Sequence, residues 1–424
     1  MRSVSITSWM SLKRQARFTE LFFQYLRKAS KRFPQMIPSL LPMKYTLAIT
    51  QQCNLACRYC YIEKNPLTMS LETAARIVGF MYRATPPRET MDIGFFGGEP
   101  LLELDLLGRI VDLVKKHDEF GSRKVLFSVV SNGTLFTEEA ARKLERYGVS
   151  IGISCDGPPE IQDRSRVFPD GSGSSAQVSS SIQEALRFFP FMPVNAVYRP
   201  ESLTALPKII DYFADLGVRN LYLNPDITAT WSDADALLLP EVYDRIGRRY
   251  IEFYRAGSPM HISLVDSKIV VLLRGGYEPA EKCRMGKGEF AFSPSGNIYP
   301  CERLIRSGDG GTHCLGNVHD DTPLSRRCSH DSERSGHEAC ASCSLFPYCM
   351  YWCGCTNFHA TGDYHMPGPF LCASERAAIS TAYGVLEELG KEGFAFSDHL
   401  AGTPLMSILG EIGALSAHRN AASE

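Results

Sequence analysis

Three cysteines in the stretch CNLACRYCY, namely Cys53, Cys57 and Cys60, are spaced so that one tight loop can present three thiolates to one metal centre. Thiolates at this spacing can hold three irons of a cubic iron–sulfur cluster, and the fourth iron is then left without a protein ligand. An iron with a vacant position can bind and reduce a small molecule, whereas a cluster with four cysteine ligands normally only stores and passes electrons. The spacing therefore predicts a site that carries out chemistry.

Zinc is the alternative for a cysteine triplet, but zinc sites usually combine two CxxC or CxxH pairs that close a tetrahedron. No fourth ligand lies nearby, since the closest histidine downstream is His117. Tyr59 stands directly before the third cysteine, where an aromatic ring can lie beside a purine. The pattern CxxxCxΦC, with an aromatic Φ, resembles the motif of the radical S-adenosylmethionine (radical SAM) superfamily. This resemblance implies a [4Fe–4S] cluster whose open iron binds the methionine amino and carboxylate groups of SAM, and cleavage of SAM to a 5′-deoxyadenosyl radical.

A GGEP segment, formed by Gly97, Gly98, Glu99 and Pro100, follows the second expected strand. Its two glycines let the backbone approach a ligand, and its carboxylate can accept a hydrogen bond from an ammonium group. The resemblance implies that this segment contacts the amino group of SAM. An ordinary turn is the alternative.

Polar residues also end the third and fourth expected strands. They resemble the SNG and SxDGP segments of peptide-modifying radical SAM enzymes, whose polar groups hold the ribose and carboxylate of SAM. In this chain they are Ser131, Asn132, Ser154, Asp156 and the following Arg166. Such residues are also common in turns, so their order along the chain carries the interpretation. Asn195 and Asn224, on the next two strands, are further candidate contacts with ribose or substrate, and a structural amide is the alternative for each.

A second group of cysteines occupies the C-terminal third of the chain, with the spacing C-x12-G-x4-C followed by C-x2-C-x5-C-x3-C and a last distant cysteine. This spacing resembles the SPASM domain, which carries two auxiliary [4Fe–4S] clusters in radical SAM maturases of peptides and proteins. A domain with two zinc ions is the alternative. The resemblance implies that Cys283, Cys301 and Cys353 hold the first auxiliary cluster, and that Cys340, Cys343, Cys349 and Cys372 hold the second.

The first auxiliary cluster has only three ligands from this set. Anaerobic sulfatase-maturating enzymes, a related family, have a further cysteine a few residues after the first, but this chain reads RMGKGEF there. Either the cluster keeps an open iron, which could bind a substrate thiolate, or Cys314 closes it. Cys155, Cys328 and Cys355 are expected to be ordinary buried or surface thiols.

Glu302 directly follows Cys301. In the sulfatase-maturating relatives that place is acidic and acts as the base that takes a proton from the substrate, which implies a catalytic role for Glu302. A glutamate in a surface salt bridge is the alternative.

These residues must be positioned by the elements between them, and from Met43 to about Val265 the sequence alternates short β-rich runs with helical patterns. The expected strands are 45–50, 91–96, 125–131, 150–154, 194–198 and 220–224, and the expected helices are 71–83, 104–120, 138–147, 179–188 and 206–216. This order predicts parallel strands joined by helical crossovers, with ligands at the carboxyl ends of the strands. The expected fold is α/β, a partial (β/α)6 TIM-like barrel of the radical SAM type followed by a small cysteine-rich SPASM domain.

The chain is expected to divide into four regions: a basic amphipathic N-terminal arm (1–43), a radical SAM core (44–265), the SPASM domain (266–372) and a C-terminal helical tail (373–424). In the arm, seven lysines and arginines between Lys13 and Arg32 face the single Glu20, and apolar residues recur at helical spacing. The arm is expected either to pack on the enzyme or to dock an acidic leader peptide or a membrane surface.

Composition agrees with a large cytoplasmic enzyme, because 424 residues with 44% hydrophobic content can bury a sizeable core. The net charge of −2 predicts no general attraction to nucleic acid. Fourteen cysteines without a signal peptide favour reduced thiols that serve clusters over a disulfide scaffold. No uninterrupted run of about 20 apolar residues predicts a membrane span.

The motifs together predict a radical SAM/SPASM maturase that modifies a residue of a ribosomally made precursor peptide, by a C–C or thioether crosslink or a related oxidation. Anaerobic sulfatase maturation, which forms formylglycine, is the second candidate, and a non-catalytic iron–sulfur or zinc binding protein is the alternative of another class. The implied cofactors are the [4Fe–4S] cluster with SAM at its open iron and two auxiliary [4Fe–4S] clusters. The implied partners are a precursor peptide or protein substrate and an electron donor such as flavodoxin or ferredoxin, with no nucleic acid.

Overall fold

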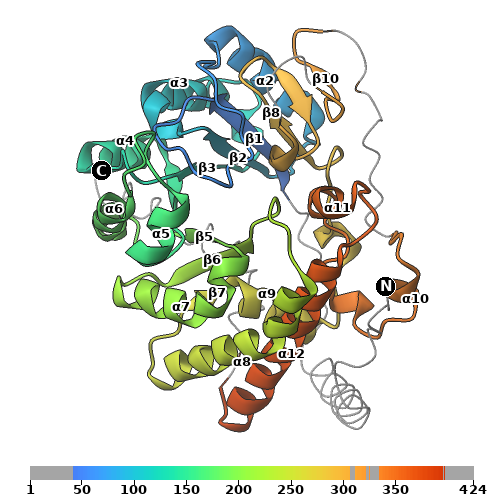
Figure 1. Cartoon of the computed structure of the whole chain (residues 1–424). Coiled ribbons are helices and arrows are strands. Elements are labelled where there is room, and N and C mark those ends of the chain that lie inside the picture. Colours follow the sequence, from blue (N-terminus) through green and yellow to red (C-terminus); the bar gives the residue numbers. More distant parts are fainter. Residues whose placement is uncertain (1–41, 306–310, 321–323, 325–333, 395, 397–424) are drawn as a thin grey trace.

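The computed structural model describes residues 42–305, 311–320, 324, 334–394 and 396 (Figure 1). The predicted N-terminal arm, apart from its last two residues, therefore lies outside the described residues. Cys328 and residues 397–424 of the predicted tail lie outside them as well.

A ten-stranded sheet runs through the molecule in the order β10-β9-β8-β1-β2-β3-β4-β5-β6-β7. Its parallel part matches the predicted strands to within two residues and consists of β1 (Met43–Thr50), β2 (Met91–Gly97), β3 (Val125–Ser131), β4 (Val149–Ser154), β5 (Val194–Tyr198) and β6 (Asn220–Pro225), extended by the short β7 (His261–Ile262). Within the described residues β7 and β10 do not pair, so the barrel is open. The predicted α/β partial barrel is confirmed.

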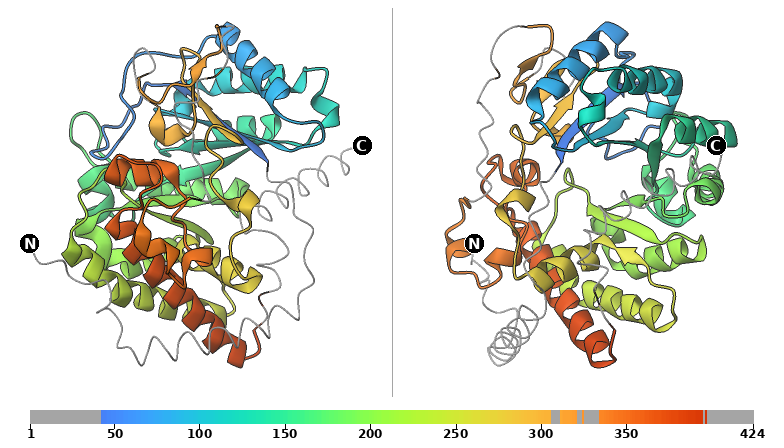
Figure 2. Two further views of the ribbon diagram at one scale, coloured as in Figure 1. Left: turned by 90° about the vertical axis from the view of Figure 1, so that its right-hand side faces the viewer. Right: turned by 180° about the vertical axis from the view of Figure 1, so that it is seen from behind.

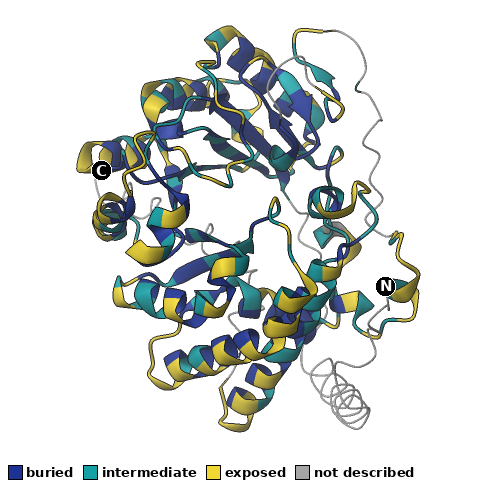
Figure 3. Cartoon of the chain, viewed as in Figure 1, coloured by how far each residue is buried: buried dark blue, intermediate teal, exposed yellow. Residues whose placement is uncertain are grey.

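The crossover helices cover the outer face of this curved sheet (Figures 1 and 2). They are α2 (Leu71–Ala84), α3 (Leu104–Lys115), α4 (Glu138–Tyr147), α5 (Pro159–Ser165), α6 (Ser175–Phe188) and α7 (Leu206–Asp215). Side-chain caps fix two of their starts, because Ser70 and Thr137 accept hydrogen bonds from the first-turn amides of α2 and α4. The strands are mostly buried, whereas the outward faces of the helices are exposed (Figure 3).

The C-terminal region continues the same sheet, which the sequence did not indicate. β8 (Glu289–Phe292) pairs in parallel with β1, β9 (Asn297–Tyr299) pairs antiparallel with β8, and the short β10 (Gly316–Asn317) follows β9. β1 thus has strands on both sides, and six of its eight residues are buried in an unbroken run. This pairing brings the segment that carries Cys301 close to β1.

Two long helices close the other end of the molecule. α8 (Asp233–Arg255), which was not predicted from the sequence, packs against α12 (Pro369–Lys391), and α12 also contacts α9 (Ser263–Arg274) (Figure 2). A buried ion pair of 2.6 Å between Lys268 and Glu375 joins α9 to α12. Among the described helices, none combines the length and the apolar character that crossing a membrane requires.

Candidate functional site

The loop after β1 carries Cys53, Cys57 and Cys60, with Cys60 exposed and the other two half-buried. The loop is held from behind, since the Ala56 and Arg58 amides donate to the carbonyls of Val167 and Ser165 at 2.6 and 2.9 Å. Burial raises the pKa of Cys57 to about 11, Arg166 opposes this shift, and the nearby Cys60 and Cys53 add to it. Three neighbouring thiols on one partly exposed loop fit a cluster with an accessible face, and binding such a group would release their protons.

Contacts within the protein explain why positions 97 and 98 of the GGEP segment are glycines. A Cβ atom on Gly98 would stand 1.9 Å from the Gln52 carbonyl oxygen, and one on Gly97 would stand 2.1 Å from the Thr50 carbonyl oxygen. Gly97 also has a φ of 127°, which side chains rarely adopt. The amides of Gly98 and Glu99 donate to those two carbonyls at 2.8 Å. Only glycine therefore lets this segment lie directly against the cysteine loop, and Pro100 then begins a short 3-10 turn.

Glu99 is fully buried, and its carboxylate accepts hydrogen bonds from protein groups. The donors are the Leu101 amide at 3.0 Å, the Ser131 hydroxyl at 2.8 Å and the Asn132 amide at 2.7 Å. Burial raises the pKa of Glu99. The carboxylate thus joins the GGEP segment to the end of β3, and this geometry favours a positioning role over a direct contact with SAM.

Asn132 continues this connection to the cysteine loop. Its side-chain nitrogen donates to Asn54 at 2.9 Å and lies 3.9 Å from the Cys53 sulfur. Asn54 in turn donates to the Thr134 hydroxyl at 2.8 Å. Neither Asn54 nor Thr134 was predicted from the sequence, although Asn54 lies next to Cys53 in the chain.

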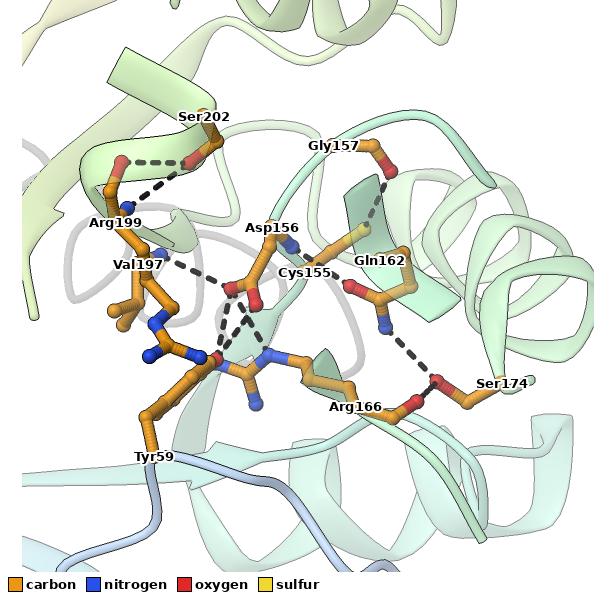
Figure 4. A network of polar contacts seen from close by, with 10 residues as sticks. All are labelled: Tyr59, Cys155, Asp156, Gly157, Gln162, Arg166, Ser174, Val197, Arg199 and Ser202. Carbon is orange, nitrogen blue, oxygen red and sulfur yellow. Dashed lines mark hydrogen bonds and ion pairs between the residues drawn. The ribbon is translucent and has the colours of Figure 1, made fainter. Parts of the chain in front are cut away.

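Tyr59, Asp156 and Arg166, predicted from three separate segments, meet in one buried network (Figure 4). The Tyr59 hydroxyl donates to both carboxylate oxygens of Asp156, at 2.7 and 2.9 Å. Arg166 Nε donates to the same carboxylate at 3.0 Å, and its guanidinium lies 5.3 Å from the centre of the Tyr59 ring. The Val197 amide donates to Asp156 as well, at 3.0 Å. The carboxylate of Asp156 therefore ties the cysteine loop to the ends of β4 and β5.

Gln162 on α5 supports this network and was missed by the sequence analysis. It accepts a hydrogen bond from the Asp156 amide at 2.8 Å and donates to the Ser174 hydroxyl at 3.0 Å (Figure 4). A buried glutamine six residues after the aspartate gives no recognisable pattern in the sequence.

Ser154 and Asn195 lie opposite each other in the β4–β5 pairing. Both are half-buried, and neither side chain makes a hydrogen bond to a described residue. Polar side chains with free hydrogen-bonding capacity at the carboxyl edge of the sheet suit contact with a ligand. A cavity of about 190 Å³ is lined by Val197, Asp156 and further charged residues that include Arg164, Arg199 and Lys208. Asn224 follows at the end of β6, opposite Val197.

The first group of C-terminal cysteines comes together in a buried cluster. Cys283 and Cys353 pack against the buried Cys301, and the buried Cys355 joins them. Cys314 lies elsewhere, packed against Ala48, Ala291, Tyr299 and Ile305, with its sulfur 3.2 Å from the Gly316 carbonyl oxygen. The structure therefore does not bring Cys314 to the three predicted ligands, whereas it brings Cys355, which was expected to be an ordinary thiol.

The second group of C-terminal cysteines lines one large cavity. Cys340, Cys343, Cys349 and Cys372 all contribute to its wall, between the segment that holds α10 (Glu338–Ala341) and the helices α8 and α12, and its volume is about 1340 Å³. Arg376 on α12 donates to the Cys343 sulfur at 3.6 Å and also hydrogen-bonds Cys372. Four thiols around one cavity with a cation beside them fit an anionic cluster.

Glu302 lies in a compact group of charges. Lys44 of β1 stands 3.6 Å from its carboxylate and 3.1 Å from that of Glu289. Burial acts to raise the pKa of Glu302, but Lys44 and Arg303 outweigh it and lower that pKa to about 2. Ligand atoms of Glu289, Cys301 and Glu302 lie within 4.8 Å of one another, and the Lys44 ammonium group offsets part of the charge of the two carboxylates. The geometry is that of an ion pair, and the catalytic role of Glu302 stays a prediction.

Comparison with known proteins gives three findings. Residues 47–190 match the family model of the Radical SAM superfamily. The chain is 23% identical over 328 residues to a cysteine-type anaerobic sulfatase-maturating enzyme of Clostridium novyi. The aligned region covers 72% of this chain and 85% of that protein.

The third finding concerns solved structures. Native anSMEcpe with bound AdoMet and the Cp18Cys peptide has a TM-score of 0.68 at 20% identity, over 84% of this chain and all of that chain. Streptococcus suis SuiB bound to precursor peptide SuiA has a TM-score of 0.53 at 13% identity, over 86% of this chain and 82% of that one. At these identities the likeness shows a shared fold.

Proposed function

We infer that this radical SAM enzyme, identified as one by its match over residues 47–190, cleaves SAM at the cysteine loop and modifies a residue of a ribosomally made peptide. The observation that carries this proposal is the gathering of Cys53, Cys57 and Cys60 on a loop that polar contacts tie to the ends of β3 and β4. A [4Fe–4S] cluster bound by these thiols would supply the electron that cleaves SAM, and the resulting deoxyadenosyl radical would remove a hydrogen from an unactivated carbon.

The chain's own residues would bind and orient the reactants. Tyr59, Asp156 and Arg166 fix the cysteine loop against β4, so that its thiols keep one position. Ser154 and Asn195 lie opposite each other in the β4–β5 pairing, with side chains that make no hydrogen bond within the described residues, and we assign them to SAM or substrate. The buried strands behind this edge exclude water from the back of the site.

A polypeptide substrate is supported by the relatives and by the C-terminal thiols. The names of the sulfatase-maturating relatives indicate that they act on a protein, the sulfatase. Both structural neighbours were solved with a bound peptide. The two groups of C-terminal thiols fit auxiliary [4Fe–4S] clusters, which would accept the electron left by an oxidative modification. We propose a cytoplasmic location and an electron donor such as flavodoxin or ferredoxin, because clusters of this kind need reduced thiols.

Sulfatase maturation is the second candidate function. The similarity to a sulfatase-maturating enzyme extends over 72% of this chain, and Glu302 follows Cys301 at the acidic place that such enzymes use. The two candidates differ in product, since formylglycine is an aldehyde and a crosslink is not.

The test compares two substrates with one enzyme preparation. Anaerobically reconstituted protein is incubated with SAM, dithionite and either a short peptide encoded beside this gene or a sulfatase fragment, and 5′-deoxyadenosine and peptide mass are measured. We expect the neighbouring peptide to lose two hydrogen atoms and to remain unreactive toward a hydrazide probe. A hydrazide-reactive sulfatase fragment would establish the second candidate instead, and 5′-deoxyadenosine without change in either peptide would contradict both.

A further inference from the structure

The buried C-terminal cluster contains one thiol more than its predicted ligand set. Cys301 and Cys355 are 6% and 4% exposed, and they share a small core with Met285 and Leu304, against which Cys283 and Cys353 pack. Four sulfurs in one apolar core are more than packing needs, because any small apolar side chain could fill the same volume. Their convergence indicates a shared ligand.

Cys355 contacts two of the three predicted ligands directly. Its sulfur lies 3.8 Å from the Cys353 sulfur, and its side chain also hydrogen-bonds Cys301. Cys283 joins the group through the backbone, since Gly354, which separates Cys353 from Cys355, hydrogen-bonds the Cys283 thiol. The contacts thus connect all four cysteines.

Two further features suit bound thiolates at this place. Cys353 occupies the position directly before α11 (Gly354–Thr361) and Cys355 lies in the first turn of that helix, where backbone amides favour negative charge. Arg303 lies beside Cys301, Cys353 and Cys355 and is held to α11 by a 3.3 Å hydrogen bond from its guanidinium to the Thr356 hydroxyl. A fixed guanidinium next to buried thiols offsets the charge that a thiolate-bound cluster carries.

We propose that Cys355 is the fourth protein ligand of the first auxiliary cluster, together with Cys283, Cys301 and Cys353. The proposal rests on the proposed function, which assigns a cluster to these thiols. It replaces both expectations from the sequence, the open iron and closure by Cys314. A cluster with four cysteine ligands passes electrons and has no iron free for a substrate thiolate, so the peptide would be held by protein groups alone.

The experiment uses a background in which Cys53, Cys57 and Cys60 are all alanine, so that only auxiliary clusters remain. Iron and sulfide content and the EPR spectrum of the dithionite-reduced protein are measured with and without potassium cyanide, a small ligand for open iron. In this parent protein we expect a spectrum that cyanide does not change. Adding Cys355→Ala should open one iron and produce a cyanide-dependent signal, with or without partial loss of iron.

Three further variants complete the design. Cys283→Ala, at a predicted ligand, should behave like Cys355→Ala, and Cys314→Ala should behave like the parent. Cys355→Ser keeps the side-chain volume, so an altered spectrum in this variant separates loss of a ligand from loss of packing. Circular dichroism checks that each variant is folded.

The outcomes separate the two hypotheses. Cyanide binding by the parent, or a Cys355→Ala spectrum identical to that of the parent, would overturn the ligand assignment while leaving the auxiliary clusters in place. Loss of iron in Cys314→Ala but not in Cys355→Ala would return the fourth ligand to Cys314. A parent protein without iron and sulfide would instead remove the auxiliary clusters from the proposed function, and the ligand assignment with them.

Discussion

The cysteine loop after β1 and the buried C-terminal cysteine cluster hold their thiols in opposite ways. In the loop, Cys60 is exposed, and hydrogen bonds to neighbouring segments fix the backbone. In the C-terminal cluster, Cys301 and Cys355 are themselves part of an apolar core. A site that must admit a ligand cannot bury its thiols, so polar contacts behind the loop must fix their position. A site that only passes electrons can be closed by packing.

This difference predicts that substitutions affect the two regions separately. Changes in the network of Tyr59, Asp156 and Arg166 should disturb SAM chemistry and leave the C-terminal iron in place. Changes in the core around Leu304 should do the reverse. A substitution in one region that changed the chemistry or the iron content of the other would contradict this separation.

Replacing Cys53, Cys57 and Cys60 together by alanine should have the largest effect. We expect complete loss of 5′-deoxyadenosine production, because no other cysteine of the described chain lies on this loop, whereas the auxiliary iron and sulfide should remain. Chromatography of the reaction and iron analysis of the purified protein measure both quantities. Persistent 5′-deoxyadenosine under reducing conditions would remove the loop from the catalytic site.

Asp156→Asn should cost about 3–5 kcal/mol of unfolding free energy, the typical result of breaking a buried ion pair from one side. The substitution leaves the guanidinium of Arg166 without its carboxylate and replaces one of the two oxygens that accept from the Tyr59 hydroxyl by a donor. Urea denaturation measures the stability, and SAM binding should weaken in parallel while the auxiliary iron is retained. Asp170→Asn, an exposed carboxylate close in sequence, is the control and should leave both properties unchanged.

Leu304→Ala tests the other region and should cost about 2–5 kcal/mol through the cavity it leaves. Leu304 is fully buried among Met285, Cys301 and Cys355, so we expect lower auxiliary iron content and unchanged SAM cleavage in the absence of peptide. Leu102→Ala removes the same atoms from a side chain that is 43% exposed and should change neither quantity. Loss of SAM cleavage in Leu304→Ala would show that the two sites are coupled.

Glu99→Gln should have the smallest effect, about 1–3 kcal/mol, because the amide nitrogen cannot accept a hydrogen bond from Ser131, Leu101 or the Asn132 amide. A positioning role predicts that the unfolding free energy falls and that SAM affinity falls with it. A direct contact with the SAM ammonium predicts lower affinity at unchanged stability, which would favour the role implied by the GGEP motif. Glu63→Gln, an exposed glutamate in the cysteine loop, serves as the control with matched charge.

The sequence predicted most of the strands and crossover helices because both depend on short-range periodicity. β3, β5 and α4 have the bounds expected from the pattern, and α6 begins only four residues earlier than expected. α3 ends at Lys115, where the helix was expected to continue to Phe120. α8 was missed because Pro240 and a run of three leucines obscure its amphipathic pattern.

The sequence by itself determined that Cys53, Cys57 and Cys60 meet on one loop, because three residues within a span of eight need only a local turn to come together. It also predicted that Asp156 and Arg166 lie near this loop, since they follow a strand whose carboxyl end was expected at the ligand edge, and both contact Tyr59 of the loop. Only the tertiary structure decided how these groups divide their roles. Protein donors occupy the carboxylates of Glu99 and Asp156, whereas the side chains of Ser154 and Asn195 make no hydrogen bond to a residue of the described chain. The choice of Cys355 over Cys314 also depended on it, because the strand β8 pairs with β1 across more than 240 residues and α11 folds back onto that strand's segment. Contacts of such sequence separation are selected by packing and burial, and no local spacing encodes them.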